Sequence, residues 1–301
     1  MSQTFGQKNM RRIGAGDLQP LFASMLADGK SPKTIRNVWV SVRSIWTAAE
    51  AHGYVDQMLP SPKLPKVYKS EAKYFRLSEV GKIIATAVGW LKTFCWLAAE
   101  TGLRASELCG LRISDVEIDR VIVREGIWHG RHVLATKNNN SKNRNVAVSM
   151  RLSAMLQAQI ESQRVKGHER LFSRENGAAI DADTLVKRGK RKGELGRIIL
   201  ACGANGALNA FRHFNITIMD HLAIPLKIRK ERVGHLPGDG TKYANVADIT
   251  LDVYTHSDWA DNVHAAELLS DAIEKVVSTS CEAVEQEKRL AGSGQQAFET
   301  V

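Results

Sequence analysis

Apolar residues recur at helical spacing through most of the chain, and this pattern predicts a mainly helical protein. The first helix is expected within residues 13–29, where Asp17 is a candidate cap. A second helix follows Ser31, with serine at the cap and Pro32 at the first helical position, and continues to Gly53. The same spacing predicts further helices from Leu77 with Ser78 as cap, at 151–166, from Asp181 through the basic residues after it, around Arg212, at 226–233 and at 262–287. Residues 90–97 are strongly apolar, and we expect them to be buried.

The periodicity changes between residues 118 and 148, where apolar and polar residues alternate. This alternation predicts three short antiparallel strands, around 121–128, 133–135 and 146–148. The polar, asparagine-rich run 138–143 is expected to be the turn between the last two strands. The predicted fold class is therefore mainly α with a small antiparallel β-sheet, an α+β protein.

A short proline-rich stretch divides the chain. Residues 59–66 contain three of the seven prolines, a composition typical of an extended linker between domains. The sequence therefore predicts a helical domain in residues 1–58, a linker at 59–72 and a larger domain at 73–287. Residues 288–301 contain glycine and glutamine in place of an apolar pattern, and we expect this tail to be disordered.

Length and composition narrow the protein class. A chain of 301 residues that is 44% hydrophobic can form two domains with sizeable cores. No apolar run is long enough to cross a bilayer, and residues 1–7 lack a signal-peptide core, so we expect a soluble, cytoplasmic protein. The four cysteines are scattered without the spacing of a metal site or a disulfide framework, and reduced thiols are expected.

Basic residues outnumber acidic ones, 42 to 32, and the net charge is +10. This excess favours a polyanionic partner, although charge alone is weak support. Basic residues are dense at 187–192 and in the segment that leads to His235. Taken alone, such runs are equally well explained as solvated helix faces. The second predicted helix also has a polar and basic face, which contains Lys33, Arg36, Asn37, Arg43 and Ser44.

Three residues in the last third of the chain have side chains suited to phosphodiester chemistry. Arg212 can hold two phosphoryl oxygens with its planar guanidinium, which stays charged at any working pH. His235 follows a glycine at a predicted helix end and can carry a proton near neutral pH. Tyr254 has a phenolic oxygen that can attack phosphorus and remain as a covalent ester. Single residues of these types usually form salt bridges or pack in cores. The functional interpretation therefore depends on their order and on the sequence around each of them.

The sequence around these residues resembles a known family. The strings Ala207–His213, Arg232–His235 and Leu251–His256 are similar to the second signature box of the tyrosine recombinases, the phage integrase family. That box reads His-x-x-Arg, then Leu-Gly-His, then Tyr. The stretch Ser31–Trp46 resembles the family's helical, SAM-like core-binding domain, which clamps one side of duplex DNA. Because that domain normally has more helices, the N-terminus of this chain is expected to be truncated or to have been assigned late.

The resemblance requires an arginine upstream, and the chain has one. The stretch Glu100–Asp115 is similar to the family's first box, in which a Thr-Gly turn delivers an arginine, here Arg104, to the start of a helix. An exposed arginine on an amphipathic helix is the plain alternative. Core-type residues surround Arg104, however, so its charge needs a partner. Phosphate would be one, and Glu107 or Asp115 would orient the guanidinium when DNA is absent.

The resemblance also requires a lysine between the two boxes. Lys137 stands at the edge of the predicted hairpin, where the family has its mobile active-site lysine. Lys142 and Arg144 are rivals for this position. Exposed hairpins often carry lysines for solubility, so the assignment of Lys137 rests on the resemblance.

The resemblance implies DNA strand cleavage and rejoining through a 3′-phosphotyrosine, as in integration, excision or recombination of mobile elements. Phosphoryl transfer by this route needs positioning and charge neutralisation, so neither a metal, a cofactor nor ATP is expected. Tyr254 would attack, Arg104 and Arg212 would stabilise the charge, Lys137 would protonate the leaving 5′ oxygen, and His235 would assist proton transfer. DNA contacts are expected from Lys33, Arg36, Arg43, Lys187, Arg188, Lys190, Arg191 and Lys230.

Two features depart from the family pattern. Asn209 stands where the family usually has histidine, so a hydrogen bond to phosphate is retained without positive charge or proton transfer. This change predicts a slower or retuned enzyme, with an inactive relative as the alternative. In addition, residues 236–246 resemble an insertion that brings Tyr243 forward as a rival nucleophile. The sequence around Tyr254 matches the family better, and we therefore favour Tyr254.

Other functions share this scaffold. A catalytically impaired DNA-binding relative would keep site recognition without cleavage, and Asn209 mildly favours it. A type IB topoisomerase would use the same chemistry to relax supercoils without pairing two sites. The family assembles as a homotetramer on paired double-stranded DNA sites, and a monomer or dimer is expected without DNA. The terminal helix at 262–287 either packs on a neighbouring protomer, as in the family, or packs within its own chain.

Overall fold

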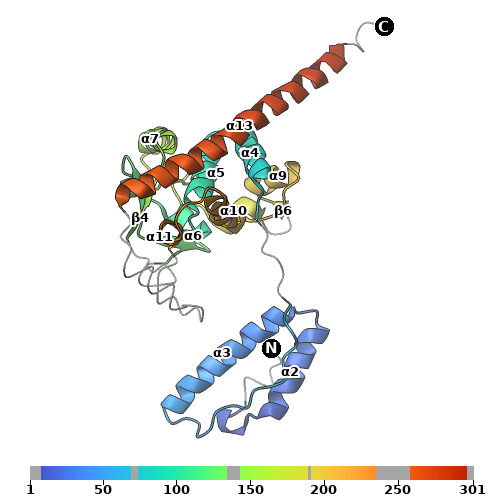
Figure 1. Cartoon of the computed structure of the whole chain (residues 1–301). Helices are drawn as coiled ribbons and strands as arrows, with labels where there is room; N and C mark the ends of the chain where they lie inside the picture. The colour runs from blue at the N-terminus through green and yellow to red at the C-terminus, as the bar shows by residue number, and fades with distance from the viewer. Residues whose placement is uncertain (1–7, 69–73, 134–142, 189–190, 235–257, 297–301) are drawn as a thin grey trace. The chain divides into compact units, whose positions relative to one another are not determined.

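The structure is a computed structural model that describes residues 8–68, 74–133, 143–188, 191–234 and 258–296. It divides the chain into two compact units, Met1–Glu71 and Ala72–Val301 (Figure 1). Each unit has a hydrophobic core of its own, so the two are described separately. Lys137, Lys142, Lys190, His235, Tyr243 and Tyr254 lie outside the described residues.

The first unit is a helical pair. Its elements are the 3-10 turn η1 (Met10–Arg12) and the helices α2 (Ala15–Ala27) and α3 (Pro32–Ala51). The ring of Phe22 on α2 meets Trp39 on α3 edge to face, with centroids 6.4 Å apart. The second tryptophan of α3, Trp46, is also buried and donates from Nε1 to the Gln57 carbonyl oxygen at 2.9 Å. These two tryptophans fix which side of α3 faces the core.

The helix starts in this unit follow the sequence closely. Ser31 Oγ accepts from the Thr34 backbone N–H at 3.1 Å, so the predicted cap of α3 is confirmed. Asp17 lies at the third position of α2, and its carboxylate accepts from the N–H of Gly14 at 3.1 Å. Asp17 therefore caps the helix from inside its first turn, as the partner of the N-cap residue.

The second unit is mainly helical, and its helices enclose one large core. The predicted helices from Leu77, at 151–166, around Arg212 and at 226–233 are confirmed, and the apolar residues 90–97 lie in a largely buried helix. The elements are α4 (Leu77–Thr86), α5 (Trp90–Thr101), α6 (Ala105–Gly110), η2 (Ile113–Asp115), α7 (Met150–Val165), α8 (Ala182–Val186), α9 (Glu194–Ala201), α10 (Leu208–His221), α11 (Leu226–Val233) and α13 (Trp259–Gln296).

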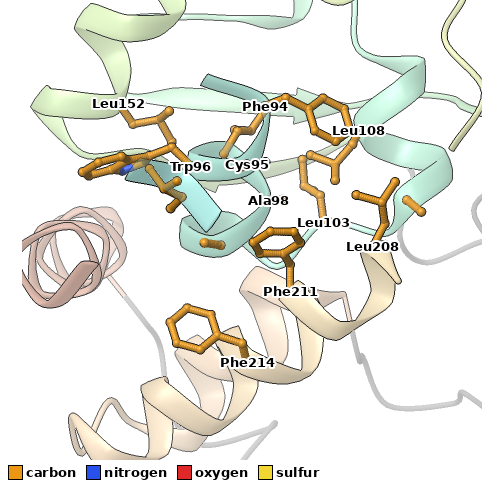
Figure 2. Packing of buried hydrophobic residues seen from close by; sticks show 14 of the residues in the cluster. Phe94, Cys95, Trp96, Ala98, Leu103, Leu108, Leu152, Leu208, Phe211 and Phe214 are labelled. Atoms are coloured by element: carbon orange, nitrogen blue, oxygen red, sulfur yellow. The ribbon is translucent and has the colours of Figure 1, made fainter. Parts of the chain in front are cut away.

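Helix α5 is at the centre of this core. Every residue from Leu91 to Thr101 except Lys92 is buried, so α5 has neighbours on all sides. Figure 2 shows its apolar side chains facing Phe211 and Phe214 of α10. The packing of α5 against α10 brings the two signature boxes together, because Arg104 follows α5 and Arg212 lies on α10.

The strands differ from the prediction in number and pairing. The first predicted strand, 121–128, is interrupted at Arg124-Glu125, and its two halves join different partners. As a result the region forms two separate two-stranded antiparallel sheets in place of one. In one sheet β1 (Arg120–Val123) pairs with β4 (Arg144–Ala147), and in the other β2 (Gly126–Trp128) pairs with β3 (Arg131–Val133).

Two local predictions were wrong. Ser78 does not cap α4, because the N-cap residue is Arg76 and its N–H donates to Glu79 at 2.7 Å. The basic helix after Asp181 is also absent, although Asp181 does cap α8. The helix ends at Val186, and the basic residues form the strands β5 (Lys187–Arg188) and β6 (Arg191–Lys192), which pair antiparallel.

Helix α13 packs within its own chain along the part whose side chains the structure describes. It lies across α4 and α5 (Figure 1), and Ala265, Leu269, Ile273 and Val277 are buried in the unit's core. At Gly81 of α4 an added methyl group would lie 2.7 Å from the Val276 carbonyl oxygen, so the two helices approach closely. The helix runs to Gln296 and includes much of the segment that was expected to be disordered.

Two further expectations can be compared with the described residues. All four cysteines are free thiols, as expected, and Cys95 and Cys109 are buried. Among the helices in this part of the chain, none combines the length and apolar character that crossing a bilayer requires.

Candidate active site

A left-handed turn places Arg104 at the start of α6. Gly102 ends α5 with φ of 62°, a conformation that L side chains rarely adopt. A methyl group at Gly102 would also lie 2.5 Å from Asn215 Oδ1, so the position requires glycine for two reasons. The chain then reverses, and Arg104 becomes the N-cap residue of α6 with a half-buried side chain.

The carboxylate of Glu107 gathers two arginines. Arg104 Nη1 donates to Oε1 at 2.9 Å, and the Arg104 backbone N–H donates to Oε2 at 2.8 Å. Arg144, the first residue of β4, binds the same carboxylate through both terminal nitrogens, at 3.1 and 2.7 Å. Glu107 therefore orients Arg104 as predicted, and Arg144 completes the arrangement.

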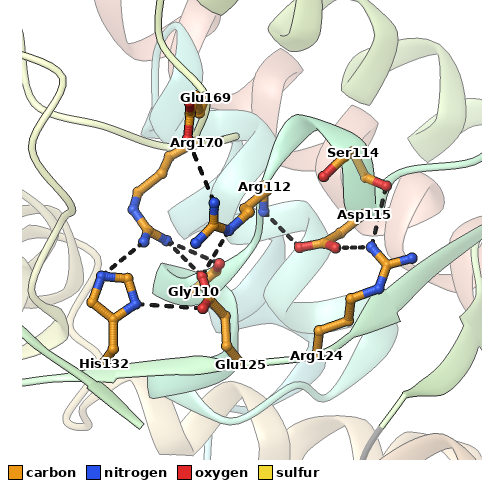
Figure 3. Close-up of polar contacts among 9 residues, drawn as sticks. All are labelled: Gly110, Arg112, Ser114, Asp115, Arg124, Glu125, His132, Glu169 and Arg170. Atoms are coloured by element: carbon orange, nitrogen blue, oxygen red, sulfur yellow. Dashed lines mark hydrogen bonds and ion pairs between the residues drawn. The ribbon is translucent and has the colours of Figure 1, made fainter. Parts of the chain in front are cut away.

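Asp115, the other candidate partner of Arg104, has a different role. It pairs with Arg124 and accepts from the Arg112 backbone N–H at 2.9 Å (Figure 3). The same figure shows Glu125 held by Arg112 at 3.0 Å and by Arg170 at 3.3 Å. This network ties the loop after α6 to β2, and it does not include Arg104.

Burial and positive charge have opposite effects on Glu107. Burial alone would raise the pKa of this carboxyl, but hydrogen bonds and charge from Arg144, with smaller effects from Arg104, lower the pKa to about 2. Glu107 is therefore ionised at any pH at which the protein works. Its single negative charge faces more than one guanidinium, so the site keeps an excess of positive charge.

Arg212 is buried on α10 and is oriented by carbonyl oxygens. Its Nη1 donates to Gly102 O at 2.8 Å, and its Nη2 donates to Val233 O at 2.7 Å. Burial, followed by the nearby charge of Arg104, lowers the pKa of Arg212 to about 10, so the group stays protonated at neutral pH. Because Arg104, Glu107 and Arg144 all act on Arg212 electrostatically, we call these four residues the Glu107 cluster.

The end of α11 lies against this cluster. Gly234 ends the helix with φ of 70°, and a methyl group there would lie 3.1 Å from Arg144 Nη1. Since Val233 also accepts from Arg212, the backbone just before His235 is held next to two of the arginines. The structure thus brings Arg104, Arg212 and the residue before His235 into one place, as the motif order predicts.

The remaining predicted catalytic positions are distributed as follows. Asn209 is exposed on α10 one turn before Arg212, and this spacing puts the two on neighbouring positions of the helix surface. Lys137 lies in the segment 134–142, outside the described residues, and this segment ends one residue before Asn143 and two before Arg144 of the cluster. His235 and Tyr254 lie in the segment 235–257, which is also outside the described residues.

The predicted DNA-contact residues fall into three places. Lys33, Arg36 and Arg43 are exposed on α3 of the first unit. The backbones of Lys187, Arg188 and Arg191 form the β5–β6 pair, and Lys187 is exposed. Lys230 is partly buried on α11.

A second buried polar group lies behind the site and was not predicted. Glu100 accepts from Trp96 Nε1 at 3.1 Å and, with its two carboxylate oxygens, from the N–H and hydroxyl of Ser149 at 2.7 and 2.9 Å. Burial raises the pKa of Glu100 to about 7, although the bonds from Ser149 and the charge of Arg232 oppose this shift. We call Trp96, Glu100, Ser149 and Arg232 the Glu100 cluster.

Arg232 joins three separate elements from inside the core. Its Nη1 donates to Ala147 O at 3.1 Å and to Asn262 O at 3.2 Å, and its Nη2 donates to Glu100 O at 3.0 Å. The side chain is 1% exposed. It therefore connects the ends of β4 and α5 and the start of α13 to the helix that precedes His235. Burial lowers the pKa of Arg232 to about 10, so it too stays charged.

One group among the described residues has the geometry of a metal site. Ligand atoms of His129, Asp181 and Asp183 lie within 4.8 Å of one another. Asp181 already caps α8 by accepting from the Asp183 N–H at 3.1 Å, and His129 Nδ1 lies 3.6 Å from Asp183 Oδ2. Because these groups partner one another at the surface, we assign them a structural role and derive no catalytic step from them.

Residues 73–248, more than half of the chain, match the model of the phage integrase family. The chain belongs to the phage integrase family. Its members are the tyrosine recombinases, enzymes that cleave and rejoin DNA in site-specific recombination, and the resemblance found in the sequence is thereby confirmed.

Curated relatives support the assignment along most of the length. A protein described as "Tyrosine recombinase XerC-like", from Caldanaerobacter subterraneus subsp. tengcongensis, is 25% identical and covers 90% of this chain and 74% of the relative. The ICEBs1 integrase of Bacillus subtilis is also 25% identical and covers 85% of this chain and 70% of the relative.

Solved structures of integrases share the fold. The Tn1549 transposon integrase in complex with transposon right end DNA superposes with a TM-score of 0.59 at 20% identity, covering 87% of each chain. A lambda integrase dimer bound to a COC′ core site gives a TM-score of 0.53 at 15% identity, over 79% of this chain and 84% of the other. These similarities confirm the predicted fold class, a mainly helical protein with small antiparallel sheets.

Three residues in or directly behind this site were not predicted in these roles from the sequence. Arg144 was considered only as a rival for the lysine position, yet it holds Glu107. Glu100 and Asn215 were not considered, although Glu100 follows a strongly apolar run in α5 and Asn215 stands between Phe214 and Ile216 in α10. A buried charge or amide in such a place needs a hydrogen-bonding partner, and that was the available signal.

Proposed function

We propose that this enzyme recombines DNA at specific sites by cleaving and rejoining strands through a 3′-phosphotyrosyl intermediate. The observation that carries the proposal is the Glu107 cluster, which contains one arginine from each signature box. The Glu107 carboxylate holds Arg104, and two backbone carbonyl oxygens hold Arg212. Fixed guanidiniums next to one another are suited to the non-bridging oxygens of one phosphodiester.

In the proposed reaction the Tyr254 oxygen bonds to phosphorus as the bond from phosphorus to the 5′ oxygen breaks. His235 assists the transfer of the phenolic proton, and Lys137 supplies a proton to the departing 5′ oxygen. Arg104 and Arg212 stabilise the negative charge on the non-bridging oxygens during this exchange. Because the phosphotyrosyl ester retains the bond energy, the reverse attack by a 5′ hydroxyl rejoins the strand without ATP.

The arginines would do here what a metal ion does in other phosphoryl-transfer enzymes. Arg212 is preorganised, since both its terminal nitrogens already donate to backbone carbonyls that carry no net charge. Arg144 neutralises most of Glu107 through two hydrogen bonds, which leaves Arg104 and Arg212 to act on the phosphate. Positioning and charge of this kind account for most of the catalysis in phosphoryl transfer.

Asn209 modifies the proposal in one respect. Its exposed amide lies one helical turn before Arg212 and can donate to a phosphoryl oxygen. It cannot carry a proton or a charge, so we expect slower cleavage than a histidine would give. For the same reason a catalytically impaired DNA-binding relative is the second candidate function.

Double-stranded DNA is the proposed substrate, and a homotetramer on paired sites is the proposed working assembly. The solved relatives described above include a dimer on a core site and a complex with transposon DNA. An integrase of a mobile element, such as a transposon, therefore fits the comparisons, and the proposed place of action is the cytoplasm.

Covalent trapping on a DNA duplex with a nick next to the cleavage site tests the chemistry. The nick lets the 5′ end diffuse away, so a cleaved strand stays attached to the protein and can be seen on a denaturing gel. We expect an adduct with the intact protein, none with Tyr254→Phe, and an undiminished adduct with Tyr243→Phe. Circular dichroism of each variant controls for folding.

The two tyrosine variants separate the possible results. Loss of the adduct only in Tyr243→Phe would reassign the nucleophile to the inserted segment. Tight duplex binding by the intact protein without any adduct would instead favour the DNA-binding relative. In that case Asn209→His tests the cause, because restoring the histidine should restore the adduct if the asparagine is responsible.

A further inference from the structure

We infer that α3 reads an A·T-containing step in the major groove of the target, through Asn37 and Val40. This inference rests on the proposed function, because it assigns part of the DNA site that the enzyme selects. It starts from the orientation of α3. Burial of Ile35, Trp39 and Trp46 fixes one face of the helix against the core, so the opposite face points outward.

The outward face has an uncharged centre. Lys33, Asn37, Val40 and Ser44 follow one another at spacings of four and three residues and form one continuous strip along the helix, which we call the reading strip. All four are exposed, and Val40 is 59% exposed. Beyond Lys33, which lies in the first turn, the strip carries only small or neutral side chains, so another molecule can approach the helix closely.

Positive charge lies along one side of this strip. Arg36 and Arg43 are exposed about a quarter turn around the helix from Asn37 and Ser44. Neither they nor Lys33 forms an ion pair with any residue that the structure describes, and the only acid in α3 is Glu50 near its end. Three cations without partners on one helix face favour a polyanion over an ordinary protein surface.

The side chains of the strip are free to bind a ligand. The hydroxyls of Ser41 and Thr47 bond back to the carbonyls of Asn37 and Arg43, at 3.2 and 3.0 Å. In contrast, the amide of Asn37 has no hydrogen-bond partner among the described residues. A free amide next to an exposed valine therefore stands at the middle of the strip.

This combination matches the edge of an A·T pair. The major groove is about 12 Å wide and admits an α-helix. There an asparagine can bond to both N6 and N7 of adenine, and an apolar side chain can pack on the C5 methyl group of thymine. Asn37 and Val40 are about 4.5 Å apart along the helix axis, close to the 3.4 Å rise of one base step. We therefore assign Asn37 to hydrogen bonds with an adenine and Val40 to contact with the thymine methyl of an adjacent base pair. Arg36 and Arg43 are assigned to contacts with backbone phosphates.

Selection from a randomised duplex pool tests the inference with the full chain. The intact protein should enrich a motif with adenine and thymine on adjacent pairs. Asn37→Ala should lose the preference at the adenine, with binding weakened roughly 5- to 150-fold, and Val40→Ser should lose it at the thymine only. Ile45→Ser is the matched control, since Ile45 is 62% exposed on the same helix but lies away from the strip, and it should leave the motif unchanged.

Deoxyuridine in place of the selected thymine removes only the methyl group. It should weaken binding of the intact protein roughly fourfold, the effect of one buried methyl, and have no effect on Val40→Ser. Arg36→Gln and Arg43→Gln should weaken binding to all sequences alike and lower the salt dependence by about one ion each.

Specific results would overturn the inference. It falls if the intact protein enriches no motif, if the motif survives Asn37→Ala and Val40→Ser, or if deoxyuridine binds as well as thymine. Equal losses in Val40→Ser and Ile45→Ser would indicate an apolar protein contact instead. Covalent trapping on the same pool tests the proposed chemistry separately. If the intact protein forms an adduct but Asn37→Ala and Val40→Ser leave the selected motif unchanged, only the α3 assignment is removed. If these variants change the motif but the intact protein forms no adduct, only the chemistry is removed.

Discussion

Glu100 and Glu107 lie on consecutive helices and are both buried, yet their surroundings give them opposite properties. Glu107 faces Arg104 and Arg144, and its pKa is lowered to about 2. Glu100 is held by neutral donors from Trp96 and Ser149, and its pKa is raised to about 7. The first carboxylate is permanently charged, whereas the second changes its charge within the physiological range.

The two buried arginines show a similar contrast. Arg212 and Arg232 both donate to backbone carbonyls and both have a pKa lowered to about 10 by burial. Arg212, however, belongs to a cluster with surplus positive charge, while Arg232 connects α5, β4 and α13 inside the core. We therefore propose that the same residue type serves anion binding in one region and cohesion of the core in the other. The predictions below test this division.

Arg212→Lys should produce the largest effect, and it should affect activity. An ammonium group cannot donate to Gly102 O and Val233 O and also hold two phosphoryl oxygens. We expect adduct formation on the nicked duplex to slow roughly 10³-fold, the loss typical of removing a preorganised charge at a transition state. Single-turnover trapping measures this rate. A rate within tenfold of the intact protein would contradict a catalytic role for the guanidinium.

Arg232→Met should have its main effect on stability. Removing the buried guanidinium takes a charged donor away from carbonyl oxygens of three elements, and we expect a loss of about 3–5 kcal/mol in the free energy of unfolding. Urea denaturation measures the loss, and Arg232→Lys should recover part of it. An unchanged urea midpoint, or a 10³-fold slower cleavage rate in the folded variant, would show that the two clusters are not divided as described.

The two glutamates should differ in how stability responds to pH. Because the pKa of Glu100 is raised in the folded state, its contribution is present below the unfolded value near 4.5 and is lost as pH rises through 7. Relative to Glu100→Gln, the intact protein should therefore lose about 2 kcal/mol of stability between pH 5.5 and 8.5.

Glu107→Gln is the matched control for this experiment. The lowered pKa of Glu107 contributes stability above the unfolded value near 4.5, which is lost only as pH falls toward 2. Its difference from the intact protein should be constant between pH 5.5 and 8.5. The assignment of the two environments would be reversed if the stability difference between the intact protein and Glu107→Gln changed with pH in this range. It would also be reversed if the difference between the intact protein and Glu100→Gln stayed constant.

Much of the fold was predictable because its determinants are local. The cap at Ser31, the proline after it and the apolar spacing from Ile35 through Val38, Val42, Ile45 and Ala48 were sufficient to predict α3. The spacing did not identify the buried face, because Ile45 and Ala48 are exposed whereas Trp39 and Trp46 are buried. Arg104 was placed at a helix start through the resemblance to the family's first box, and the structure shows that Gly102 makes the turn before it. In both cases residues within one or two turns of each other carry the information.

The errors arose where distant residues decide the outcome. Nothing in the local sequence of the basic run after Asp181 argues against a helix. In the structure, however, α8 ends at Val186, where Gly193 packs directly on the Leu185 carbonyl. Arg232 was read as part of a basic segment because its partners Ala147 and Glu100 lie far away in the sequence. A single sequence shows that a buried polar group needs a partner and does not identify that partner.

The packing of α13 limits how protomers can exchange parts. Ala265, Leu269, Ile273 and Val277 fill the core of their own unit, and Trp259 at the helix start donates to Asp119 at 2.6 Å and lies under Arg120. Withdrawing this half of the helix would expose several apolar side chains, and each large one costs about 1.5–3 kcal/mol. A swap of the whole terminal helix between subunits is therefore unfavourable. Contacts with a second subunit would be made by the helix beyond Val277 or by its outer face, while the first half stays packed on α4 and α5 of its own unit.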